Sequence, residues 1–146
     1  GVVRVENSRI TRKEYRLINP KTYFLKDFTL NCHGLSEDDV KDSPEFDAVW
    51  QELLPMLEGA DFIAAHNAKF DKDVMHLCCK KYSLAPPEQR FVCSFEISKK
   101  IWKLPSSKLN RVCEHLKIPL NHHHALSDAN GCAEIMIRAM QEGYVV

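Results

Sequence analysis

The stretch that most constrains the fold is the C-terminal run from Ala125 to Met140, which has the spacing of a helix packed closely on one side. Small and apolar residues recur there at steps of three and four residues, as they do on one face of an α-helix. The alanines at 125, 129 and 133 would let a sheet or a ligand approach this face closely. Asp128 lies within or at the edge of the same face, where a carboxylate needs a charge partner or a metal ion. The alternative is a partly exposed aspartate favoured by the helix dipole.

A second informative stretch covers residues 61–71. A short apolar strand over 61–66 ends in His66 and Asn67, and Asp71 then opens a helix predicted to reach about residue 82. Taken alone, Asp71 is better explained as an ordinary helix N-cap, a common position for aspartate.

The remaining pattern predicts a mixed sheet flanked by helices. Residues 1–7 and 9–19 alternate like the two strands of a hairpin, and 91–93 is a further short strand. Helices are expected over 43–59, 94–102 and 109–116. Tyr23, Phe24 and Phe28 belong to a loop or short helix expected to pack over the sheet.

Size and composition indicate one soluble domain, spanning 1–146. No run approaches the roughly 18 apolar residues that a membrane helix needs, so no membrane association is expected. The six cysteines show no Cys-x-x-Cys pair and suit reduced thiols in a cytoplasmic protein.

The formal net charge of the chain is zero, but the charged residues are unevenly distributed along the sequence. Residues 36–61 carry nine Asp/Glu and one Lys, whereas residues 69–111 carry ten Lys/Arg and four Asp/Glu. A basic half beside the His66–Asp71 stretch could hold a phosphate backbone, although solvated helix faces explain most of these lysines individually.

Two motifs carry a resemblance to a known family. His-Asn-Ala-x-Phe-Asp at 66–71 and His-x-Ala-Leu-x-Asp-Ala at 123–129 resemble the second and third motifs of the DEDDh-type (DnaQ-like) 3′–5′ exonucleases, which include the proofreading epsilon subunit of bacterial DNA polymerase III. The order and separation of the motifs fit, and the resemblance extends over essentially the whole chain. It implies a ribonuclease-H-like α/β fold, with a mixed β-sheet flanked by helices.

The resemblance also implies a chemistry. Such enzymes hydrolyse phosphodiester bonds at 3′ ends of single-stranded DNA or RNA and release nucleoside monophosphates, alone or with a polymerase or repair complex. Asp71 and Asp128 match two of the family's metal ligands, and a two-metal site for Mg²⁺ or Mn²⁺ is expected. His123, five residues before Asp128, matches the general base. His66 and Asn67 would contact substrate or position Asp71, with a purely structural role equally open.

Three neighbours of these residues are expected to be less important. His122 and His124 are interpreted as positional or surface residues. A zinc site on the triple-histidine run is discounted, because adjacent residues of a strand point in opposite directions. Phe70 is expected in the core rather than as a platform for a base.

The family's first motif, an Asp-x-Glu pair on a central strand, is absent from this sequence. That strand would lie between the strands at about 1–6 and 61–66, so we expect a domain truncated at its N-terminus. A strand donated by another chain, or direct pairing across the gap, are the alternatives. Two aspartates alone would hold two ions weakly. The competing hypothesis is therefore a catalytically defective exonuclease-fold module used for nucleic-acid or protein binding.

Overall fold

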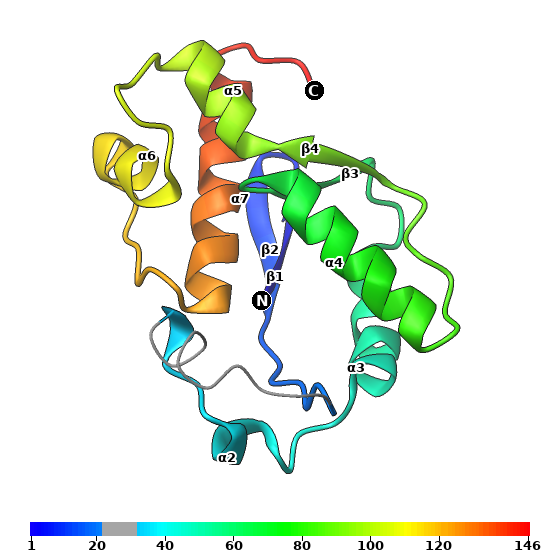
Figure 1. Cartoon of the computed structure of the whole chain (residues 1–146). Coiled ribbons are helices and arrows are strands. Elements are labelled where there is room, and N and C mark those ends of the chain that lie inside the picture. Colours follow the sequence, from blue (N-terminus) through cyan, green and yellow to red (C-terminus); the bar gives the residue numbers. More distant parts are fainter. Residues whose placement is uncertain (22–31) are drawn as a thin grey trace.

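The computed structural model describes residues 1–21 and 32–146 and is shown in Figure 1. Strands β1 (Val2–Glu6) and β2 (Arg9–Glu14) form the expected antiparallel hairpin, with Glu6 opposite Arg9. Both turn residues, Asn7 and Ser8, have positive φ, as the tightest hairpin turns require. The stretch containing Tyr23, Phe24 and Phe28 lies outside the described residues.

The second hairpin strand is shorter than the prediction of 9–19. It ends at Glu14, and the chain then leaves the ladder to contact the segment before α3 (Phe46–Leu53). There the backbone N–H of Asn19 donates to the carbonyl of Pro44 at 2.9 Å, and its side-chain amide donates to that of Lys41. In residues 15–19, which were predicted to continue the strand, these contacts take the place of strand pairing.

A parallel pair forms the second sheet. Strands β3 (Phe62–Ala65) and β4 (Arg90–Cys93) pair in register, connected by α4 (Ala68–Lys81). Helix α4 begins three residues before the predicted start at Asp71. Its N-cap is Asn67 in the left-handed conformation, which asparagine tolerates better than most residues. The interpretation of Asp71 as an N-cap is therefore wrong, because this residue lies inside the first turn.

Short helices complete the first half of the chain. α2 (Glu37–Val40) carries a capping box between Ser36 and Asp39. α3 begins after Glu45, later than the predicted start at 43, and runs into a 3₁₀ turn, η1 (Leu54–Met56), where Pro55 prevents a regular helix. Trp50 on α3 is buried, as its position in the amphipathic pattern predicted.

Helix α7 (Ala125–Gln141) organises the core. It contacts β1, β2, β3, α5 (Ser94–Ile101) and α6 (Leu109–Leu116), and it lies between α6 and the strands in Figure 1. Ile135 on α7 is completely buried among apolar residues of α6 and its flanks. Ala139 and Met136 pack on α5 in a second cluster. Among the described residues, no helix has the length and apolar character needed to cross a membrane.

The strands form two two-stranded sheets rather than one continuous sheet. Within the described residues, β1 pairs only with β2 and β3 pairs only with β4, so direct pairing of β1 with β3 does not occur. Both sheets contact α7, which joins them into one α/β arrangement. Mixed antiparallel and parallel strands flanked by helices confirm the predicted fold class.

One face of α4 is unexpectedly open. Phe70, Val74 and Leu77 are 65%, 43% and 66% exposed, although the sequence placed Phe70 in the core. The residues of α4 that are buried are Ala68 and Cys79, which lie on a different face. The core prediction for Phe70 is wrong because the helix turns this other face toward the protein.

Candidate active site

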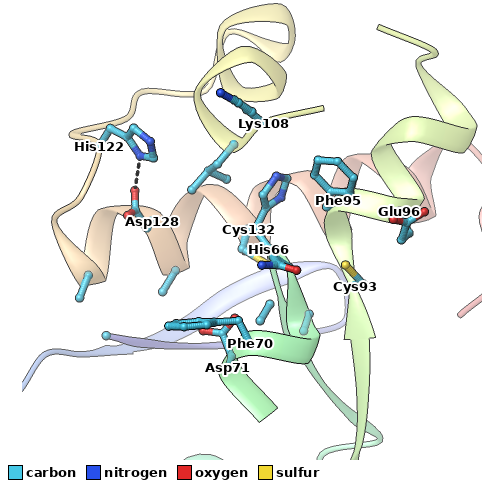
Figure 2. Close-up of a pocket in the computed structure, with 17 residues that line it drawn as sticks. His66, Phe70, Asp71, Cys93, Phe95, Glu96, Lys108, His122, Asp128 and Cys132 are labelled. Carbon is cyan, nitrogen blue, oxygen red and sulfur yellow. Dashed lines mark hydrogen bonds and ion pairs between the residues drawn. The ribbon is translucent and has the colours of Figure 1, made fainter. Parts of the chain in front are cut away.

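A cleft of about 800 Å³ opens where β3 and β4 end and where α4, α5, α6 and α7 begin. Figure 2 shows its side chains converging from these separate elements. Four of the residues singled out in the sequence line it: His66, Asn67, Asp71 and Asp128. Chain segments more than 50 residues apart therefore meet at one place, at the carboxyl ends of the parallel strands.

Asp128 lies in the first turn of α7 and is held by the loop that precedes the helix. Its Oδ1 is 3.2 Å from Nδ1 of His122, and its Oδ2 accepts the backbone N–H of His123 at 3.1 Å. The hydrogen bond to His122 is drawn in Figure 2. Each carboxylate oxygen retains a further lone pair for a ligand, because a carboxylate accepts about four hydrogen bonds.

The histidine loop has a sharp turn at its centre. His123 has a φ of +70°, a left-handed conformation that reverses the usual alternation of side chains. The rings of His122 and His123 consequently stack, with centroids 3.9 Å apart and planes at 22°. The premise used to discount a metal site, that adjacent rings point in opposite directions, is wrong because this segment is a turn and not a strand.

His123 itself is not among the residues that line the cleft. Its backbone N–H contacts Asp128, but its Nδ1 is directed to Sγ of Cys32 at 3.9 Å. Of the three consecutive histidines, His122 is the one that lines the cleft. His124 has a structural role, because its Nδ1 accepts the backbone N–H of Ser127 as the cap of α7.

Asp71 approaches the same cleft from α4. Burial on the protein side of its carboxyl group raises the pKa of Asp71 above its usual value. Among residues 1–21 and 32–146, no cation forms an ion pair with it. A partly desolvated carboxylate without a cationic partner is suited to accept a metal ion.

His66 is tied into the protein by both ring nitrogens. Nδ1 is 2.9 Å from Oγ of Ser94 at the start of α5, and Nε2 is 2.8 Å from the carbonyl of Ser107. Burial lowers the pKa of His66, so the neutral ring is favoured. The contacts favour the structural alternative for His66, which links β3, α5 and the segment before α6. Asn67 makes no side-chain cap bond and remains open to the cleft.

Sequence reasoning did not assign functional roles to three further residues that line the cleft. Phe70 offers an exposed ring beside Asp71, Lys108 brings a cation at the start of α6, and Glu96 adds a carboxylate from α5. The only available signal was for Phe70, which lies inside the His-Asn-Ala-x-Phe-Asp motif. The sequence around Lys108 and Glu96 predicts only charged residues on the protein surface. The fold brings both residues to the cleft.

Comparison with known proteins gives a consistent result. Residues 1–136 match the family model RNase_T, described as an exonuclease. A PolC-type DNA polymerase III of Caldanaerobacter subterraneus is 31% identical over 144 residues, covering 97% of this chain and 10% of the relative. The corresponding protein of Thermotoga maritima is 28% identical over 142 residues, with the same coverage. The chain thus spans about a tenth of the length of these curated relatives.

Solved structures share the fold. Exonuclease X in complex with 5′-overhanging duplex DNA superposes with a TM-score of 0.76 at 21% identity, covering 99% of this chain and 82% of that one. A 3′-exonuclease that recognises the histone mRNA stem-loop gives a TM-score of 0.79 at 18% identity, with 93% and 67% covered. The nuclease domain of 3′hExo, a DEDDh family member bound to rAMP, gives 0.73 at 19% identity, with 86% and 70% covered.

Proposed function

This chain belongs to the RNase_T exonuclease family, and from that premise we propose that it is a metal-dependent 3′–5′ exonuclease. It hydrolyses phosphodiester bonds at the 3′ end of single-stranded DNA or RNA and releases nucleoside monophosphates. The observation that carries the proposal is the opening of Asp71 and Asp128, from two distant elements, onto one cleft.

The donor set of the cleft is compatible with Mg²⁺ or Mn²⁺, which prefer carboxylate oxygens. Asp71 and Asp128 would hold the ions, and the pKa of Asp71, which burial raises, supports this role. When bound, two such ions generate a nucleophile from water and stabilise charge on the attacking and leaving oxygens. Two aspartates from the described residues supply part of such a ligand set.

The protein groups have separate tasks in this proposal. His123 takes the proton of the attacking water, which requires its ring to turn from Cys32 toward the cleft. His122 and the backbone N–H of His123 orient the carboxylate of Asp128. His66 positions the end of β3 through its two hydrogen bonds.

Substrate contacts follow from the open side of the cleft. Asn67 and the exposed ring of Phe70 are placed to contact a nucleotide, since aromatic rings stack on bases of any sequence. Lys108 would attract a backbone phosphate. The cleft, at about 800 Å³, is within the range of volumes that hold small ligands.

We place this activity in proofreading or repair in the cytoplasm. Association with a DNA polymerase is part of the proposal, and it is supported by the similarity to PolC-type DNA polymerase III proteins. All six cysteines of the chain are free, which supports a reducing compartment. The competing function, a defective module that binds nucleic acid or protein, predicts binding without cleavage.

The test is digestion of 5′-labelled single-stranded DNA and RNA with Mg²⁺ or Mn²⁺, and with a chelator. We expect a ladder of products shortened from the 3′ end that disappears with the chelator and in the Asp71→Asn and Asp128→Asn variants. Asp61→Asn, at an exposed site outside the cleft, is the matched control. Binding of the oligonucleotide without shortening under every metal condition would favour the defective module.

A further inference from the structure

The loop before α7 and the first turn of that helix bring together three side chains whose donor atoms differ from those that Mg²⁺ prefers. One ligand atom from each of His122, His123 and Asp128 lies within 4.8 Å of the others. One of these pairs, Nδ1 of His122 and Oδ1 of Asp128, is 3.2 Å apart. Two ligand atoms bound tetrahedrally to zinc at about 2.0–2.2 Å are about 3.3–3.6 Å apart, so the separation of this pair is close to the one that zinc requires.

The backbone maintains this arrangement. The left-handed turn at His123 brings both rings to one side, although left-handed backbone is costly for a residue other than glycine. The turn is held by the backbone N–H of His124, which donates to Asn121, and by the N–H of Asn121, which donates to Oγ of Ser127 at 2.7 Å. The cluster is therefore built by the fold and does not depend on two long, freely rotating side chains.

The ligand types select the ion. Imidazole nitrogens suit Zn²⁺, Co²⁺, Ni²⁺ and Cu²⁺, whereas Mg²⁺ prefers oxygen ligands. We propose that His122, His123 and Asp128 form a binding site for Zn²⁺ and related transition-metal ions, with the fourth position open to solvent. Three protein ligands and one open position are a common arrangement for zinc outside purely structural sites.

The site would regulate the proposed nuclease, and this consequence rests on the proposed function. Zn²⁺ at this position engages Asp128, which the nuclease needs for Mg²⁺ or Mn²⁺, and occupies His123, the proposed general base. Zn²⁺ is therefore an inhibitor that competes with the activating ion. The order of affinity at this site is Zn²⁺ above Co²⁺ above Mn²⁺, with Mg²⁺ weakest.

Direct binding tests the site without any nuclease assay. The untagged chain, stripped of metal and kept reduced, is titrated with Co²⁺, whose visible absorption reports tetrahedral nitrogen and oxygen ligation, and Zn²⁺ is then added as competitor. We expect one equivalent to bind. His122→Ala and His123→Ala should each weaken Zn²⁺ binding at least about tenfold, since even loss of a residue that only supports a ligand costs that much.

His115→Ala is the matched control, because His115 is exposed on α6 and lies outside the cluster. Circular dichroism and the melting temperature establish that each variant is folded. Equal affinity in His122→Ala and His115→Ala, or loss of binding in Cys32→Ser but not in His122→Ala, would overturn the proposal. A chain that cleaves DNA but binds no Zn²⁺ overturns this inference alone, whereas one that binds Zn²⁺ but cleaves nothing contradicts only the proposed nuclease.

Discussion

At the scale of single residues, the contacts of Asp128 allow its chemistry to be separated from its structural role. In Asp128→Asn the amide oxygen can still accept the N–H of His123, but the negative charge is lost. We expect nuclease activity to be abolished while the melting temperature without metal changes little. Activity is measured as nucleotide release with Mn²⁺, beside Asp61→Asn. Turnover equal to that of the original chain would contradict a role in metal binding.

His123 and His122 can be distinguished by rate. Because the proposed task of His123 in cleavage is proton transfer, His123→Ala should slow cleavage by about 10²–10⁴-fold while the activating Mn²⁺ held by Asp71 and Asp128 is still bound. His122→Ala should have the smaller effect on rate, since its ring only orients Asp128. The measurement is single-turnover cleavage at saturating Mn²⁺. A larger loss in His122→Ala would reassign the base to His122, which lines the cleft.

Asp71 should make stability depend on pH. Its folded-state pKa is raised by burial, so ionisation of Asp71 disfavours the folded state. This cost is absent below the ordinary pKa of 3.8, grows as the pH rises through the raised value, and is complete above it. Without metal, Asp71→Asn should therefore raise the melting temperature at pH 7.

This stabilisation should shrink as the pH falls toward 4. The comparison between variants cancels the contribution of His66, whose lowered pKa makes the chain less stable as the pH falls. Melting temperatures are recorded with a chelator from pH 7 to pH 4, again beside Asp61→Asn. A rise in the melting temperature of Asp71→Asn that does not depend on pH would show that burial of Asp71 does not control its ionisation. A lower melting temperature of this variant at pH 7 would show the same.

At the scale of elements, α7 supports both the core and the cleft. Ile135 is fully buried between α7 and α6, ten residues from the start of the helix. Ile135→Ala should lower the free energy of unfolding by about 2–5 kcal/mol through lost burial and a cavity. Leu77→Ala, on the exposed face of α4, should change it by less than about 0.5 kcal/mol. Urea unfolding measures the free energy of unfolding of both variants. Equal losses in Ile135→Ala and Leu77→Ala would show that Ile135 does not lie in the core.

At the scale of the whole molecule, the two sheets leave strand edges that an added strand could pair with. Within residues 1–21 and 32–146, β1 and β3 each have one strand partner. Gly1 lies in the cleft against the start of α7, where burial lowers the pKa of its amino group. Residues joined to Gly1 would thus begin inside the cleft. The proposal of a domain completed by a central strand that carries Asp-x-Glu can be tested by adding such a segment.

We expect an alternating apolar extension with Asp-x-Glu to raise both the urea midpoint and the affinity for Mn²⁺. Each new backbone hydrogen bond contributes about 0.5–1.5 kcal/mol, and two more carboxylates enter the cleft. A Gly/Ser extension of equal length is the control. Equal unfolding midpoints for the two extensions would show that no strand enters between the sheets.

The sequence by itself determined the helix from Ala125, the hairpin, the strand that ends near His66, and the two motifs that identify the family. These features depend on local periodicity and on short runs of residues, which survive without knowledge of the tertiary structure. It also indicated Asp71 and Asp128 as the residues to examine, although their catalytic roles remain predictions.

Only the tertiary structure decided which side chains share the cleft and how they point. The exposure of Phe70 depends on which face of α4 meets the sheet, and the bonding of His66 depends on Ser94 and Ser107, which are distant in sequence. The stacking of His122 on His123 depends on a single left-handed residue. Such properties arise from packing between separate elements, and no local pattern of residue types encodes them.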